Sequence, residues 1–305
     1  MGCDLLRYAR LRPGPEFRPL RATLYYCQRL VTNDILRSTI STLIATGIRM
    51  RHPLSETHVG AASSIALSSL VRDGCAGLGA MLDPAQVQEI HNFLADKEML
   101  SSAGDPVTTS AYPQDVGVAA YPLATILACP YLLDLANAHW IIALASAYLG
   151  CKPTISSIGL RWFFPNGSRQ TDVQHFHRDP DDWRFLKFFV YLTDVTMRTG
   201  PHLFVRTSHR GAGDLRCHIY SRDEIEQKYG AEQIQPFLGD KGTGFIANTR
   251  GIHCAAAPLD GPRLIFQVQY SLLPVFAFLY QPEQAAQQIE LDPYINRLIV
   301  ARSNS

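Results

Sequence analysis

A short polar motif, His177-Arg178-Asp179, stands near the start of the β-rich half of the chain. In a strand-like segment alternate residues share a face, so His177 and Asp179 can point toward one metal ion while Arg178 points away. His253 follows a glycine-bounded strand and is the candidate third ligand. Two imidazoles and one carboxylate on one face of an iron ion leave three adjacent positions open, which an oxygen-activating Fe(II) site requires.

A basic residue follows this triad closely, because Arg263 lies ten residues after His253 and opens the strand-like run 263–271. Along that run Leu264, Phe266, Val268 and Tyr270 form one apolar face, and Arg263, Ile265, Gln267 and Gln269 form the other. If the second face lines a cavity, the Arg263 guanidinium can bind a carboxylate through two parallel hydrogen bonds. The pattern predicts a site for an anionic co-substrate beside the metal.

The elements that must position these residues are mostly short strands beyond Pro153, separated by Gly, Pro and Asp. We expect strands over 155–164, 185–192, 202–205, 243–247 and 264–271. This rhythm is typical of an antiparallel sandwich or barrel, so we predict an α+β fold with a mostly β core. Helices are expected over 33–48, after Asp83-Pro84, over 132–149 and over 220–229, the last with Ser221 as N-cap.

We divide the chain into an N-terminal extension (1–69), a catalytic domain (70–275) and a helical tail (276–305) that packs on the same domain. The chain has 47% hydrophobic and 18% charged residues, which suits a globular protein. A formal charge of +1 gives no sequence-wide field to attract nucleic acid or an anionic membrane. The apolar stretches 116–133 and 135–151 are interpreted as buried helices rather than membrane spans.

The seven cysteines are scattered and contain no C-x-x-C pair, which argues against a disulfide framework or a zinc knuckle. We therefore expect a reducing, cytoplasmic location. The extension and the tail could each mediate homo-oligomerisation, cover the barrel or bind a partner.

In these motifs the sequence resembles the phytanoyl-CoA dioxygenase family of Fe(II)- and 2-oxoglutarate-dependent oxygenases. The matching pieces, in order, are Tyr148-Leu-Gly-Cys-Lys-Pro153, His177-Arg-Asp179, Lys187-Phe-Phe-Val-Tyr-Leu-Thr-Asp194, Gly200-Pro-His202, Ser208-His209, Gly244-Phe245, His253 and Pro262-Arg263. The resemblance spans about residues 70 to 275 and implies a double-stranded β-helix, a jelly-roll or cupin-like barrel, with flanking helices.

The resemblance also implies a role for each matching residue. His177, Asp179 and His253 would bind Fe(II), and Arg263 would pair with the distal carboxylate of 2-oxoglutarate. Gln174 matches a co-substrate contact of some relatives, and His202 falls where relatives often have a Thr with that role. Ala255 replaces a frequent Ser.

The remaining candidates concern the substrate. Phe189 falls near a contact position of relatives, and Lys187 and Tyr191 share its face of the strand; Arg161 precedes the motif. Packing is the alternative role for Phe189, and surface exposure is the alternative for Arg161. His175 is a rival ligand, a residue that supports the ligands through a hydrogen bond, or a substrate contact. His209 is interpreted as a structural residue, Cys254 as a small buried hydrophobe, and 101–122 as a variable lid.

The resemblance implies hydroxylation of a small or medium organic metabolite with O2, releasing succinate and CO2. Halogenases on this scaffold have Ala or Gly where this chain has Asp179, so the carboxylate favours oxygen transfer. Two alternatives stay open: a catalytically inactive binding or scaffold protein on the same barrel, and a zinc hydrolase built from the same three ligands.

Overall fold

Antiparallel strands rich in β-branched and aromatic residues form the centre of the computed structural model, which describes residues 7–54, 60–101, 103–108, 116–165, 175–211, 218–285 and 290–302. The main sheet has the strand order β2-β10-β7-β12-β6-β5-β3-β4. Its strands are β2 (Cys75–Ala80), β3 (Met99–Ser101), β4 (Pro106–Val107), β5 (Val118–Ala120), β6 (Thr154–Phe163), β7 (Phe185–Tyr191), β10 (Thr243–Ala247) and β12 (Arg263–Ser271). The central strand β12 pairs with both β6 and β7.

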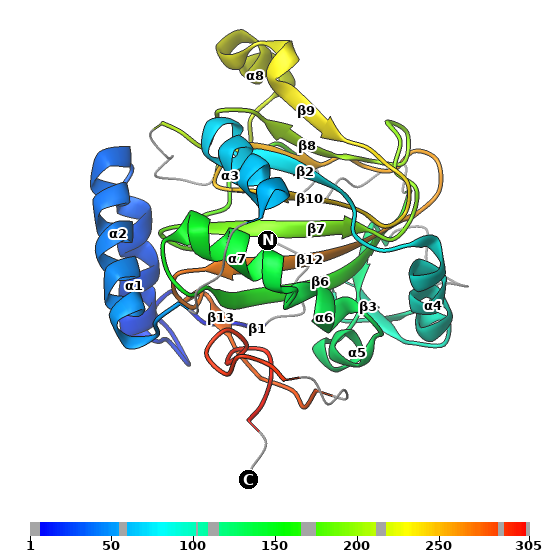
Figure 1. The fold of residues 1–305 in the computed structure, drawn as a ribbon, viewed down its shortest axis with the longest axis horizontal. Helices are drawn as coiled ribbons and strands as arrows, with labels where there is room; N and C mark the ends of the chain where they lie inside the picture. The colour runs from blue at the N-terminus through cyan, green and yellow to red at the C-terminus, as the bar shows by residue number, and fades with distance from the viewer. Residues whose placement is uncertain are drawn as a thin grey trace.

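A smaller sheet, in the order β11-β8-β9, accompanies the main sheet (Figure 1). It consists of β8 (His202–Val205), β9 (Ile234–Phe237) and β11 (His253–Ala255), and a separate pair joins β1 (Arg7–Tyr8) to β13 (Phe278–Leu279). An aromatic cluster lies between the two sheets, because Phe189, Tyr191 and Phe245 of the main sheet pack with Phe237 of β9. Two antiparallel sheets closed around such an interior form the predicted double-stranded β-helix.

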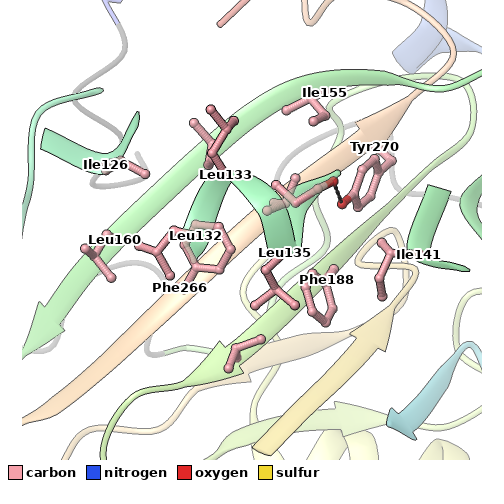
Figure 2. Packing of buried hydrophobic residues seen from close by; sticks show 14 of the residues in the cluster. Ile126, Leu132, Leu133, Leu135, Ile141, Ile155, Leu160, Phe188, Phe266 and Tyr270 are labelled. Atoms are coloured by element: carbon pink, nitrogen blue, oxygen red, sulfur yellow. Dashed lines mark hydrogen bonds between the residues drawn. The ribbon is translucent and has the colours of Figure 1, made fainter. Parts of the chain in front are cut away.

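The other face of the main sheet carries the large hydrophobic core, and Figure 2 shows part of it. Phe266 and Tyr270 of β12 and Phe188 of β7 contact the apolar helices α6 (Leu132–Ala136) and α7 (His139–Leu149). The Tyr270 hydroxyl donates to the Ala136 carbonyl at 2.6 Å. The alternation predicted for residues 263–271 is therefore confirmed, with the apolar face toward the helices and Ile265 in the barrel interior.

The described helices are α1 (Pro19–Leu30), α2 (Asp34–Arg51), α3 (Ala61–Asp73), α4 (Pro84–Leu94), α5 (Leu123–Ala128), α6, α7, α8 (Arg222–Tyr229) and a 3-10 turn at 231–233. Asp83 and Ser221 each cap a helix through a reciprocal capping box, which confirms two predicted helix starts. The single helix expected over 132–149 is two helices, because the chain breaks at Asn137.

Apolar length alone would let the stretch 132–149 cross a membrane. Half of it is buried inside the protein, where it covers the main sheet. The tail differs from its prediction, since its described residues from 290 to 302 form turns rather than a helix. This tail lies along the edge of β6, where the Ile155 amide donates to the Ile295 carbonyl at 2.9 Å.

Candidate metal centre

Three side chains converge in the structure: His177 and Asp179 come from the segment before β7, and His253 is the first residue of β11. His177 and His253 face each other in an isolated antiparallel bridge, with backbone N–H···O distances of 2.9 and 3.0 Å. The Asp179 amide donates to the carbonyl of Thr249 at 2.9 Å, so both ligand-bearing segments are joined by backbone bonds. The candidate ligand atoms of His177, Asp179 and His253 all lie within 4.8 Å of one another.

Each histidine has one nitrogen in a hydrogen bond and the other turned toward Asp179. The His177 Nδ1 lies 2.8 Å from the His175 carbonyl, and the His253 Nδ1 lies 2.9 Å from the Gly251 carbonyl. A carbonyl only accepts, so Nδ1 carries the proton in each ring and Nε2 keeps its lone pair. The Nε2 atoms lie 3.5 and 3.4 Å from the two Asp179 oxygens. This orientation by a backbone acceptor is the usual support for a metal-binding imidazole.

A buried lysine orients the carboxylate. The Lys187 Nζ lies 2.7 Å from Asp179 Oδ2 and 3.3 Å from Asp181 Oδ2. Burial opposes ionisation of Asp179, but the positive charge of Lys187, which donates to Oδ2, and the two adjacent histidines hold its pKa well below the usual range. The carboxylate is therefore ionised and fixed in direction before any metal binds.

Arg263 is a buried cation without an acidic partner. Its side chain is 1% exposed, and its guanidinium lies 4.4 Å from the Phe163 ring centre. Among the residues that the structure describes, it pairs with no carboxylate, and its Nε has no hydrogen-bond partner. Burial lowers its pKa to about 10, so the group stays charged at neutral pH. A buried charge of this kind normally requires a counter-charge.

His202 lies beside the histidine pair. Its ring stacks 5.4 Å from that of His253 and lies 5.0 Å from that of Phe189. Its side chain is 5% exposed, and Nε2 has no hydrogen-bond partner among the described residues. Burial, and then the charges of His253 and Arg263, hold its pKa well below the usual range, so the ring is neutral. The Tyr191 hydroxyl accepts from the His202 amide at 2.9 Å.

The other predicted substrate residues occupy distinct places. Phe189 stacks on Phe245 at 4.8 Å, and Tyr191 is fully buried in the same cluster. Arg161 donates to the Gln267 side chain at 3.3 Å and lines a cavity of about 320 Å³. Lys187, in contrast, is engaged by the two carboxylates described above.

The remaining predictions concern supporting residues. Gln174 lies outside the described residues, and so does part of the expected lid. The His175 carbonyl supports His177, and its side chain is not among the clustered ligand atoms. His209 lies 3.4 Å from the Val71 carbonyl. Cys254 is 3% exposed and is a free cysteine.

Sequence reasoning missed two contributors to the site. Asp181 is the second acid that contacts Lys187. Its place two residues after Asp179 could have indicated this contact, because alternate residues of an extended segment share a face. Arg178 points away from the cluster as predicted, and there it donates to the Ser208 and Arg250 carbonyls at 2.7 and 2.8 Å. These bonds tie the motif to the turn that precedes His253.

The fold was compared with known proteins. No protein-family model matches the sequence, and no curated protein matches it. The solved structure of EctD from S. alaskensis with 2-oxoglutarate and 5-hydroxyectoine is similar, with a TM-score of 0.52 and 19% identity over 84% of this chain and 92% of that chain. The epimerase SnoN in complex with Fe3+, alpha ketoglutarate and nogalamycin RO has a TM-score of 0.50 and 20% identity over 69% and 83%.

At these identities the likeness concerns the fold. The chain has the double-stranded β-helix architecture of these structures.

Proposed function

We propose that the protein is an Fe(II)- and 2-oxoglutarate-dependent dioxygenase of the phytanoyl-CoA dioxygenase type. It would hydroxylate a C–H bond of a small or medium-sized organic molecule with release of succinate and CO2. One observation carries the proposal: the His177–Asp179–His253 cluster lies in the same barrel as Arg263, a buried guanidinium without an acid. The similar folds of EctD and SnoN, whose structures contain 2-oxoglutarate, support it.

The donor set fits Fe(II). Two imidazole nitrogens and one carboxylate oxygen are the ligands of non-haem Fe(II) oxygenases, and their shared face leaves room for further ligands. Lys187 occupies Oδ2 of Asp179, which leaves Oδ1 as the better placed donor. When bound, Fe(II) with 2-oxoglutarate and O2 supplies the oxidant that removes hydrogen from the substrate.

The anion site fits the keto acid. Arg263 would bind its distal carboxylate, which would supply the missing counter-charge and an acceptor for the unpartnered Nε. His202 stacks on His253, so its neutral ring would contact the keto acid beside the metal ligands. Buried aromatic side chains of the interior, among them Phe189 and Phe245, would exclude water from this region.

The cavity beside Arg161 is the candidate substrate site. Its volume of about 320 Å³ falls at the lower end of the range for small-molecule sites. Arg161 and Ser157 provide polar groups, and the Ser157 hydroxyl is buried without a hydrogen-bond partner among the described residues. A substrate with an acceptor oxygen and an apolar body suits this lining.

Succinate formation tests the proposed function. Protein reconstituted with Fe(II) should convert 2-oxoglutarate to succinate slowly on its own and faster with an accepted substrate. Asp179→Ala should abolish this conversion, and Asp223→Ala on the exposed helix α8 is the matched control. If the wild type forms no succinate across a broad metabolite screen, the scaffold-protein alternative replaces the proposal.

A further inference from the structure

The N-terminal helices α1 and α2 stand against one end of the main sheet (Figure 1). Their polar contacts go to the loop that follows Asp179. The Gln28 side chain donates to the carbonyls of Pro180 and Asp181, at 3.2 Å in both cases. Ser41 lies 3.3 Å from the Trp183 carbonyl. Helices that were predicted as an extension therefore contact the segment that carries a metal ligand.

Arg37 of α2 makes several of these contacts at once. Its guanidinium donates to the carbonyls of Asp182 at 2.5 Å and Trp183 at 3.1 Å, and also to that of Gln28 in α1 at 2.7 Å. The side chain is 7% exposed and lies 5.3 Å from the Trp183 ring centre. A planar guanidinium fixes several acceptors at once, so Arg37 sets the path of this loop relative to both helices.

The first turn of α2 reaches the second ligand-bearing segment. Asp34 pairs with Arg250 at 3.1 Å, and the Arg250 side chain also donates to the His209 carbonyl at 3.3 Å. Arg250 belongs to the turn between β10 and His253, and the same turn accepts from the amide of Asp179 through Thr249. Helix α2 therefore holds both loops that present the ligands.

We infer that the α1–α2 pair is a brace for the metal centre and that Arg37 is its main positioning residue. The inference rests on the proposed function for the identity of the metal. His177 and Asp179 come from a loop, and His253 stands at the first position of β11. Side chains on loops and at strand ends keep a ligand geometry only when outside contacts fix them. Loss of such supporting contacts typically weakens metal binding 10- to 100-fold.

Cobalt(II) titration of the full-length apo protein tests the brace, with visible absorption as the readout. Arg37→Met should raise the Kd for Co(II) about 10- to 100-fold. At saturating Co(II) its Kd for 2-oxoglutarate should stay within about twofold of the wild type, because Arg263 is not touched. A general loss of stability would not weaken Co(II) binding while leaving 2-oxoglutarate binding unchanged. The Kd of Arg37→Lys for Co(II) should lie between those of the wild type and Arg37→Met, since lysine keeps the charge but not the planar guanidinium.

The control is Arg51→Met, which removes an exposed arginine from the end of the same helix. It should bind Co(II) like the wild type. If folded Arg37→Met also binds like the wild type, Arg37 has no positioning role. If Arg37→Met does not fold, Gln28→Leu replaces it, with an expected loss of about 3- to 10-fold; an unchanged Kd there overturns the brace.

Hydrogen exchange separates a failure of the brace from a failure of the proposed function. If the wild type binds no Co(II), the metal proposal is wrong, but the brace still predicts faster exchange of amides 181–184 in metal-free Arg37→Met than in Arg51→Met. Equal exchange in the two variants would contradict it.

Discussion

The Nζ of Lys187 lies 2.7 Å from Oδ2 of Asp179, at a position where the strand β7 meets the loop of the metal-ligand motif. The ammonium also contacts Asp181, so one largely buried cation pairs with two largely buried carboxyl groups. The metal-free protein thus holds Asp179 ionised and oriented. A bound divalent cation would join this cluster rather than build it.

Lys187→Met should destabilise the metal-free protein by about 3–5 kcal/mol, because it leaves two buried carboxylates without their cation. A metal ion would restore part of the lost charge balance. We therefore expect Fe(II) or Co(II) to raise the Tm of the variant by more than it raises that of the wild type. Differential scanning calorimetry with and without metal measures both quantities.

The matched control is Lys152→Met, which breaks the 2.7 Å pair with Asp292 at a partly exposed site. Its cost should be about 1 kcal/mol or less and should not depend on metal. An equal metal-induced Tm gain in Lys187→Met and the wild type would show that Lys187 does not balance the metal site.

Gly200 precedes β8 with a φ of +77°, and a Cβ there would lie 2.4 Å from the Ala256 carbonyl oxygen. That carbonyl also faces Arg263, whose Nη1 lies 3.5 Å away. Gly200→Ala should therefore move the anion site and raise the KM for 2-oxoglutarate several-fold, with little change in metal affinity. Steady-state kinetics at saturating Fe(II) provide the measurement.

Gly211→Ala is the control for this substitution, since Gly211 has a φ of +112° and an open space around its Cβ position. Gly211→Ala has only the cost of placing alanine at a positive φ, about 1 kcal/mol or more, without the steric clash expected at Gly200. If both variants change the KM equally, the contact with Ala256 has no role in co-substrate binding.

Asp182 is 1% exposed, and burial raises the pKa of its carboxyl to about 7, although backbone amides of Leu273 and Trp183 donate to it. The unfolded chain releases this proton at about pH 4. The contribution of Asp182 to stability should therefore be greatest below about pH 4 and fall as the pH rises toward 7, by on the order of 1.4 kcal/mol per pH unit at most. Above that pKa the loss should level off.

Asp182→Asn keeps an acceptor for the Leu273 amide and removes the ionisation. Urea unfolding at about pH 5 and about pH 8 should show a smaller loss of stability for the variant than for the wild type. Parallel pH dependences in the two proteins would contradict the raised pKa.

Local patterns predicted much of the fold. The alternation along residues 263–271 and the capping boxes at Asp83 and Ser221 depend on nearby residues alone, and the structure confirms them. β2 was missed because Cys75–Ala80 contains two glycines and two alanines, which have low strand propensity; its pairing with β10 stabilises it.

Contacts between distant segments account for what the sequence could not predict. The parity of β7 placed Lys187 on the same face as Phe189, but its contact with Asp179 depends on how a loop returns to that strand. The contacts of Arg37 with a loop about 145 residues away leave no local pattern. Asn137, where the predicted helix breaks, likewise has a remote hydrogen-bond partner, Asn296.

Anaerobic titration with Fe(II) and then 2-oxoglutarate tests the central claim most directly. A keto acid chelated to Fe(II) gives a visible charge-transfer band, so the wild type should develop this band in proportion to bound 2-oxoglutarate. His177→Ala should show no band, and Arg263→Ala should need much more 2-oxoglutarate to reach it. Folded wild-type protein that binds Fe(II) but shows no band at saturating 2-oxoglutarate would contradict the assignment of Arg263 and the metal cluster to one active site.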